Sequence, residues 1–158
     1  MKRKLRIALV AHDNRKTDMI DWVIYNSSFL AEHSLVCTGT TGTLVKEALA
    51  SRDVHPDMQI MTSGPLGGDA EIAAMVVRKE IDLAVFLIDD LNAQPHEADI
   101  MMLLRQCRVH NIPIACNRYS ADLMITSNLW DDDDYIAMNP HYEVFDRQKH
   151  EDNINKYK

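Results

Sequence analysis

The sequence predicts an open α/β domain, with a mainly parallel five-stranded sheet and helices on both of its faces. Three observations lead to this fold class. Five continuous apolar runs of strand length recur along the chain, stretches with helical apolar spacing separate them, and the connections are short. Continuous apolar runs are typical of strands buried on both faces, and alternation of strand and helix is typical of parallel sheets with right-handed crossovers. We therefore expect a Rossmann-like architecture.

The expected elements follow one another through the first 117 residues. The predicted strands are rich in Val, Ile, Leu and Ala. They span residues 6–11, 34–38, 58–62, 81–88 and 112–117. The predicted helices carry apolar side chains at three- and four-residue spacing, which is the pattern of Met19, Ile20, Val23 and Ile24. They span residues 17–32, 42–51, 69–79 and 97–110.

The chain is predicted to form a single domain over residues 1–158. Its length and its apolar content of 46% suffice for one ordinary core but not for two comfortable domains. The sequence contains no internal repeat and no Pro/Gly/Ser-rich linker. After Pro140 we expect a helix, and from about residue 148 a polar tail with a frayed end. The acidic run 131–134 is interpreted as a solvated turn without chemistry.

The composition argues against several classes of function. A net charge of −7 and a pI near 5.4 do not fit a nucleic-acid surface, because phosphate backbones are held by clustered Lys and Arg. The apolar run 7–11 is too short for a secretion signal or a membrane span. Cys37, Cys107 and Cys116 lie in apolar segments without a CxxC pair. We therefore expect reduced core cysteines and a cytoplasmic location.

Candidate functional residues are expected in the loops at the carboxyl ends of the strands, where open parallel sheets bind their ligands. The loop after the first strand brings together an imidazole, a carboxylate and an ammonium group, from His12, Asp13 and Lys16. Such a cluster indicates a functional site. The alternative is that Asp13 only caps the following helix and Lys16 is a solvated residue of its first turn.

The loop after the second strand has the sequence Thr38-Gly39-Thr40-Thr41-Gly42 and leads directly into a helix. Free backbone N–H groups, hydroxyls and glycines at a helix start form a cradle for a phosphate group. The loop lacks the GKS or GKT of a Walker A motif and the GxGxxG of dinucleotide folds. We expect one small phosphoester as the ligand, with Lys16 as its cation. A Thr/Gly turn that merely starts a helix would look similar.

The loops after the third and fourth strands supply acid and base groups. The segment 63–69 contains three glycines and ends in Asp69 at a helix start, where Asp is also a common N-cap. The fourth loop supplies His96 and Asp99, which complete an acid/base set with Asp69. Imidazole and carboxylate could together bind a divalent metal. No tight ligand spacing such as HxxxH is present, so no metal is expected.

Taken together, these loops resemble the methylglyoxal synthase family. The matching residues are Ala11, His12, Asp13, Lys16, 38–42, 63–69, Pro95, His96 and Asp99. The resemblance runs in order and spacing from Ile7 to Tyr142, and the Ser-Gly-Pro-x-Gly-Gly-Asp loop is its most specific element. It implies the methylglyoxal synthase-like fold and a homohexameric carbon–oxygen lyase that needs no cofactor.

The reaction implied by the resemblance converts dihydroxyacetone phosphate into methylglyoxal and inorganic phosphate through an enediolate, as a bypass of glycolysis. Inorganic phosphate is expected to be both product and feedback inhibitor. Dihydroxyacetone phosphate is the expected small-molecule partner, and no nucleic-acid or membrane partner is expected.

The resemblance also implies a role for each matching residue. Asp69 is the implied general base, Asp99 a second active-site carboxylate, and His12 and His96 surround the substrate oxygens. The implied phosphate-binding residues are Lys16, Thr38, Gly39, Thr40, Thr41, Ser63 and Gly64. The chain departs from the family pattern at Asp90, where a proline is common. Arg147 is a shifted candidate for a phosphate-binding arginine and stays unassigned.

Two alternatives remain open at the level of sequence. The same fold and phosphate loops also serve as non-catalytic effector-binding modules, since fold alone does not fix function. The joint presence of Asp69, His96 and Asp99 favours the enzyme, because a binding module has no use for them. Isomerisation of the triose from the same enediolate is the second alternative.

Overall fold

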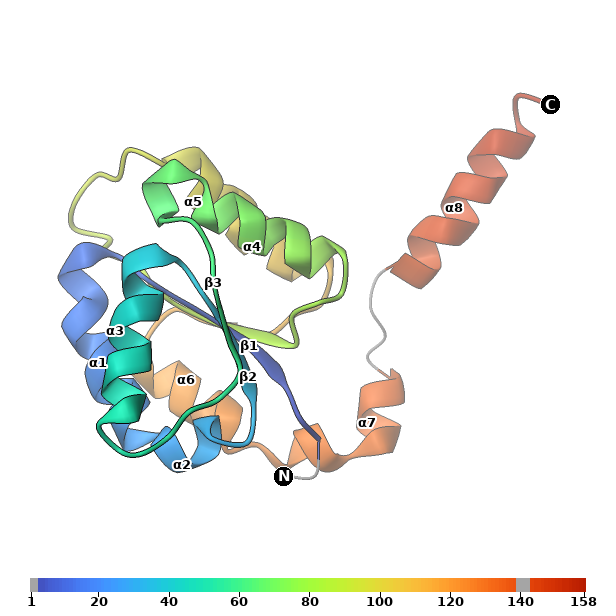
Figure 1. The fold of residues 1–158 in the computed structure, drawn as a ribbon. Helices are drawn as coiled ribbons and strands as arrows, with labels where there is room; N and C mark the ends of the chain where they lie inside the picture. The colour runs from blue at the N-terminus through green and yellow to red at the C-terminus, as the bar shows by residue number, and fades with distance from the viewer. Residues whose placement is uncertain (1–2, 139–142) are drawn as a thin grey trace.

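The computed structural model describes residues 3–138 and 143–158, and for residues 143–146 it describes the backbone alone. One parallel sheet contains five strands in the order β3-β2-β1-β4-β5. The strands are β1 (Arg6–Ala11), β2 (Ser34–Cys37), β3 (Met58–Ile60), β4 (Leu83–Leu87) and β5 (Ile114–Ala115). Helices cover both faces of the sheet (Figure 1). The predicted open α/β fold is therefore confirmed.

Each observed strand lies within a predicted apolar run. The two edge strands, β3 and β5, are clearly shorter than the runs that predicted them. An edge strand pairs on one side only, so its outer residues gain fewer ladder hydrogen bonds. The central strand β1 pairs with β2 from Arg6↔Ser34 onward and with β4 from Ile7↔Leu83 onward.

Alternate residues of the strands enter two separate cores, one on each face of the sheet. On one face Ile7 and Leu9 pack with helices α1 (Lys16–Tyr25), α3 (Gly39–Ala50) and α6 (Arg118–Ile125). On the other face Ala8 and Val10 pack with α4 (Gly68–Val77) and α5 (Glu97–Val109). Because both faces are covered, the inner strands carry no polar face, which explains their continuous apolar sequences.

The predicted helix 17–32 is interrupted at Asn26, and a short helix α2 (Ser27–Leu30) follows. The Asn26 side chain donates to the Trp22 carbonyl at 3.0 Å and to Asp122 Oδ1 at 3.1 Å. Trp22 Nε1 donates to the same carboxylate oxygen at 2.8 Å. The break therefore depends on a contact with α6, almost one hundred positions later in the chain. The local apolar pattern around Asn26 does not show this contact.

The chain beyond β5 adds α6, a 3-10 helix at Asn128–Asp131, α7 (Asp133–Met138) and α8 (Glu143–Asn155). The acidic run 131–134 is exposed, as expected, but it joins two helices, with Asp132 Oδ1 accepting the Tyr135 N–H at 2.9 Å. Helix α8 continues past residue 148 and stands away from the sheet (Figure 1). Pro140 and Tyr142, which bounded two of the expectations, lie outside the described residues.

The cysteines do not all belong to the core. Cys37 and Cys107 are buried, but Cys116 is exposed, so the expectation of three core cysteines is wrong. The reason is the shortness of β5, which ends at Ala115 and leaves the next side chain outside the sheet. None of the described helices is long and apolar enough to cross a membrane.

We expect Cys116, the exposed thiol, to react with a colorimetric disulfide reagent in the folded protein before the two buried ones. Burial raises the pKa of the Cys37 and Cys107 thiols to about 12, so little reactive thiolate forms there. Desolvation and the charge of Asp90 raise the pKa of Cys116 as well, so its advantage comes from access of the reagent. All three should react after denaturation. Peptide mapping of the labelled native protein checks the assignment to Cys116, and rapid native labelling of Cys107 would contradict it.

Candidate active site

The loops at the carboxyl ends of β1 to β4 enclose a small cavity of about 70 Å³. The lining comes from the end of β1, from these four loops and from the first turns of the helices that follow. It consists of Val10, Ala11, His12, Asp13, Lys16, Thr38, Thr40, Thr41, Ser63, Gly64, Pro65, Asp69, Gln94 and His96. Of the residues that were assigned a role from the sequence, Gly39 and Asp99 do not line the cavity. Gly39 opens α3 beside Thr38, and Asp99 lies in the first turn of α5.

His12 lies directly after β1, with its ring against Phe86 and His96. Its Nδ1 accepts the main-chain N–H of Asp89 at 2.9 Å. The neutral ring therefore carries its proton on Nε2, which is buried without a hydrogen-bond partner among the described residues. Burial, followed by the neighbouring His96, lowers the pKa of His12. The site thus presents a neutral imidazole with an N–H available to a ligand.

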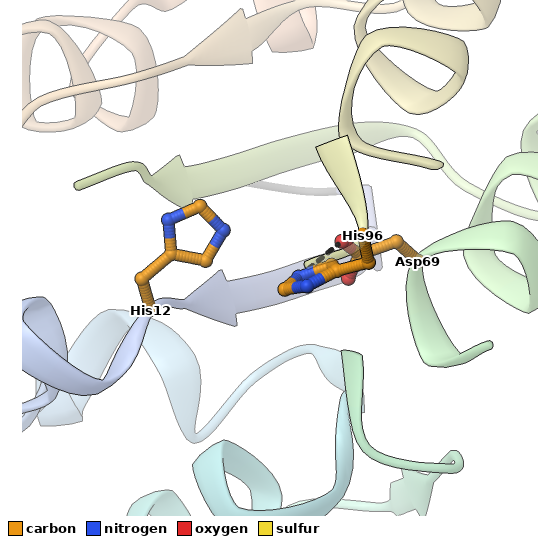
Figure 2. A group of neighbouring side chains, drawn as sticks. All are labelled: His12, Asp69 and His96. Atoms are coloured by element: carbon orange, nitrogen blue, oxygen red, sulfur yellow. Dashed lines mark ion pairs between the residues drawn. The ribbon is translucent and has the colours of Figure 1, made fainter. Parts of the chain in front are cut away.

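Asp69 and His96 form the second half of the site (Figure 2). Asp69 is fully buried in the first turn of α4, and its Oδ2 lies 3.3 Å from His96 Nε2. Neither Asp69 oxygen has a hydrogen-bond partner among the described residues. A Cβ built on Gly64 would lie 3.1 Å from His96 Nε2 and 3.3 Å from Asp69 Oδ1. The absent side chain at this position leaves space directly in front of the pair.

Burial raises the pKa of the Asp69 carboxyl group. His96 lowers this pKa in part, and the charge of Asp99 raises it further. Asp99 therefore acts on the site electrostatically from α5 without lining the cavity. A carboxylate whose pKa is raised in a closed site is a stronger base than an exposed one.

Another part of the cavity lining presents hydrogen-bond donors from the first turns of α1 and α3. Thr38 and Thr41 are buried, and Thr41 Oγ1 donates to the Ala11 carbonyl at 3.2 Å. The N–H groups of Thr40 and Thr41 belong to the first turn of α3, where helical geometry offers them no carbonyl acceptor. Lys16 Nζ donates to the Ala11 carbonyl at 3.0 Å and to Asp13 Oδ1 at 2.8 Å. An ammonium group and a helix N-terminus therefore converge on one wall.

One ligand atom from each of His12, Asp69 and His96 lies within 4.8 Å of the other two, which is a possible metal-ligand set. A metal ion would need the lone pair of His12 Nε2. That atom carries the proton, because Nδ1 accepts the Asp89 N–H. The cluster is thus arranged to donate a hydrogen bond at His12 and not to ligate a metal there.

Several residues of the site were not found from the sequence. Gln94 lines the cavity, and Asp89 holds His12 through its main-chain N–H. Asn14 Nδ2 donates to Asp89 Oδ2 at 2.8 Å and so connects the first loop with the fourth. Gln94 has no local motif, and the Asn14–Asp89 contact joins residues far apart in sequence. Asp90 is exposed, and the lining of the cavity does not include Arg147.

A larger cavity of about 670 Å³ lies at the opposite edge of the sheet, near the starts of β4 and β5. Its lining is mainly apolar and includes Ile81, Pro113 and Trp130. Asp82 in this cavity already accepts hydrogen bonds from the Arg3 side chain and the Arg6 N–H. The smaller cavity is the candidate active site, despite its smaller volume, because His12, Asp69, His96 and Lys16 line it.

Comparisons of the sequence and of the structure with known proteins agree on one family. A family model described as "MGS-like domain" matches residues 18–116. The chain is 67% identical to a methylglyoxal synthase of Treponema socranskii, over 98% of each chain. It is 44% identical to a methylglyoxal synthase of Yersinia enterocolitica, over 90% of each chain. The crystal structure of methylglyoxal synthase from Elizabethkingia anophelis NUHP1 is similar with a TM-score of 0.71 and 37% identity, covering 88% of this chain and 83% of that one.

Proposed function

Since the chain belongs to the methylglyoxal synthase family, we propose that it is a lyase that eliminates phosphate from dihydroxyacetone phosphate to give methylglyoxal. One observation carries this proposal. The side chains of Asp69, His96 and His12 converge on a cavity whose lining also offers an ammonium group and a helix N-terminus, which suit a phosphate group. A module that only bound a phosphoester would have no need for a buried base.

In the proposed reaction Asp69 removes a proton from the hydroxymethyl carbon of the substrate. The carbon acid is far weaker than a carboxyl group, so the negative charge that develops on the carbonyl oxygen must be stabilised. Hydrogen-bond donors preorganised at that oxygen supply such stabilisation. The Nε2–H of His12 and the imidazole of His96 are the proposed donors, assisted by the backbone N–H near Gly64. Enclosure in a small cavity strengthens each of these interactions.

The resulting enediolate has two possible fates. Return of the proton gives the isomeric triose phosphate. Cleavage of the bridging C–O bond expels inorganic phosphate and leaves the enol of methylglyoxal, which then becomes the ketoaldehyde. Elimination is fast when the C–O bond lies across the enediolate plane and overlaps its π system. We propose that Lys16, Thr40, Thr41 and Ser63 hold the phosphate group out of that plane.

The test is incubation of the purified protein with dihydroxyacetone phosphate in the presence of EDTA, while free phosphate and derivatised methylglyoxal are followed. Equimolar appearance of the two products supports the lyase. Accumulation of glyceraldehyde 3-phosphate would support the isomerase alternative. Substrate binding without turnover would support an effector-binding module.

Replacing Lys16 with Met is expected to lower kcat/KM by about 10- to 100-fold. A hydrogen bond to a charged group contributes about 1.5–3 kcal/mol, and Lys16 would bind the phosphate in the ground state and as it departs. Steady-state kinetics provide the measurement. The matched control is Lys46→Met, which changes an exposed lysine on α3. Equal kinetics for the Lys16 variant and its control would remove Lys16 from the phosphate site.

Replacing Asp99 with Asn is expected to move the acid limb of the pH profile of kcat/KM to lower pH. This limb reports the loss of a proton from the essential base of the free enzyme. The charge of Asp99 helps to raise the pKa of Asp69, so its removal lowers that pKa and keeps the base ionised in more acidic solution. A limb that stays in place, or moves to higher pH, would show that Asp99 does not tune Asp69.

We further propose that the enzyme is a cytoplasmic homohexamer, as the family resemblance implies. We also propose that inorganic phosphate inhibits it. Exposed apolar side chains at Leu66, Leu91 and Met101 are available for contacts between subunits. Phosphate inhibition would follow from product binding to the wall formed by Lys16 and α3. Light scattering checks the oligomer, and initial rates at several phosphate concentrations check the inhibition.

A further inference from the structure

The carboxylate of Asp89 connects two loops of the active site. Asn92 Nδ2 donates to Asp89 Oδ2 at 2.9 Å, and the Leu91 N–H donates to Oδ1 at 3.1 Å, so two of its contacts are local. The third contact comes from the loop after β1, where Asn14 Nδ2 donates to Oδ2 at 2.8 Å. The Asn14–Asp89 bond therefore ties the loop that follows His12 to the loop that carries His96.

This connection reaches His12 through the backbone. The main-chain N–H of Asp89 donates to His12 Nδ1 at 2.9 Å, and the main-chain N–H of His12 donates to the Leu87 carbonyl at 3.1 Å. His12 is thus held through its main chain to Leu87, the last residue of β4, and through its ring to Asp89, two residues later. If the Asp89 peptide turns away, Nδ1 loses its only donor among the described residues and the proton is free to move to either nitrogen.

We propose that Asn14 is a positioning residue for the reaction, acting through Asp89 to keep the proton of His12 on Nε2. This proposal rests on the proposed function, in which the Nε2–H of His12 donates to the enediolate oxygen. Asn14 itself does not line the cavity, so it acts without touching the substrate. Outer residues that orient metal-ligating histidines change metal affinity or activity by about 10- to 100-fold when they are removed, and we expect an effect of about this size for His12.

Loss of the Asn14 side chain should lower kcat and leave KM almost unchanged. Among the described residues, the side chain of Asn14 donates to Asp89 and to none of the proposed phosphate-binding residues Lys16, Thr40, Thr41 and Ser63, so substrate binding should be retained. Asn14→Ala should lower kcat by about 10-fold with little change in KM. Asn14→Asp should lower kcat further, because it keeps the shape of the side chain but replaces the donor with a charge that repels Asp89.

Asn92→Ala is the matched control, since it removes an amide donor to the same Asp89 oxygen but leaves the two loops connected. Both asparagines are exposed, and all three variants should keep the wild-type unfolding midpoint within a few degrees. Asn92→Ala should lower kcat by less than Asn14→Ala. If Asn92→Ala lowered kcat as much as Asn14→Ala or more, the Asn14–Asp89 hydrogen bond between the two loops would have no special role.

The second measurement is independent of turnover. Imidazole 15N spectra of protein labelled at histidine distinguish the nitrogen that carries the proton, and loss of a signal in His12→Asn assigns His12. We expect a protonated Nε2 in the wild type and a mixture of tautomers in Asn14→Asp. An unchanged His12 signal in that variant, or a rise in KM at constant kcat, would overturn the proposal. A wild-type protein with no turnover would instead refute the proposed function, while the spectra still report on the tautomer.

Discussion

Replacing Asp69 with Asn is expected to reduce turnover by about 10²- to 10⁴-fold, which is the usual contribution of a general base. Asn has nearly the same shape as Asp but cannot accept a proton from carbon. Asp69 is fully buried, and neither of its oxygens has a hydrogen-bond partner among the described residues, so the variant loses a charge contact with His96 at 3.3 Å but no hydrogen bond. The loss should therefore appear in kcat, with the unfolding midpoint unchanged or raised.

The measurement is release of inorganic phosphate at saturating substrate, together with thermal unfolding of the same samples. Asp21→Asn, an exposed residue of α1, is the matched control and should retain wild-type activity. If the folded Asp69 variant kept more than about a tenth of wild-type turnover, another residue would have to remove the proton. Asp99 would then be the next carboxylate to test.

Replacing Gly68 with Ala is expected to destabilise the protein by about 3 kcal/mol or more, as severe overpacking does. A Cβ at this position would overlap the carbonyl oxygen of Thr62 and lie 2.9 Å from its carbonyl carbon. Backbone atoms cannot turn away as a flexible side chain can. Relief requires the start of α4 to move away from the segment after β3, which would also displace the adjacent Asp69.

Gly67→Ala is the control for this prediction. Gly67 has a φ of 111°, but a Cβ there would meet nothing within 4 Å, so Ala costs only about 1–2 kcal/mol for the left-handed backbone. Guanidinium unfolding at equilibrium gives both values. Equal destabilisation of the two variants would show that the contact with Thr62 relaxes easily and that backbone conformation alone sets the cost.

The strands and the site loops could be predicted because their signals are local. Val, Ile, Leu and Ala in a run mark a strand such as β4 whatever its neighbours are, and the parallel fold then places every loop after a strand at one edge. Asp69 and the lining residues that we propose to bind phosphate were located in this way. The helix break at Asn26 was missed because it depends on Asp122 of a distant helix.

Other features of the site depend on pairs of residues that only the folded chain brings together. Asp99 has the sequence position of an active-site residue, yet one turn into α5 its side chain acts on Asp69 by charge and does not line the cavity. The orientation of His12 depends on Asp89, which lies in the loop after β4 and is far from His12 in the sequence. No local sequence pattern encodes such a contact. The exposure of Cys116 could not be predicted either, because it depends on where β5 ends.

The central position of β1 in the sheet has a consequence for how the protein is made. A nascent chain can pair β1 with β2 early, since Arg6 faces Ser34, but the other edge of β1 waits for residues 83–87 to be synthesised. Until then an apolar strand edge is open to other chains. Its closure is a non-local event that should limit the folding rate. The newly made amino-terminal half is therefore the part of the protein with the greatest need for a chaperone.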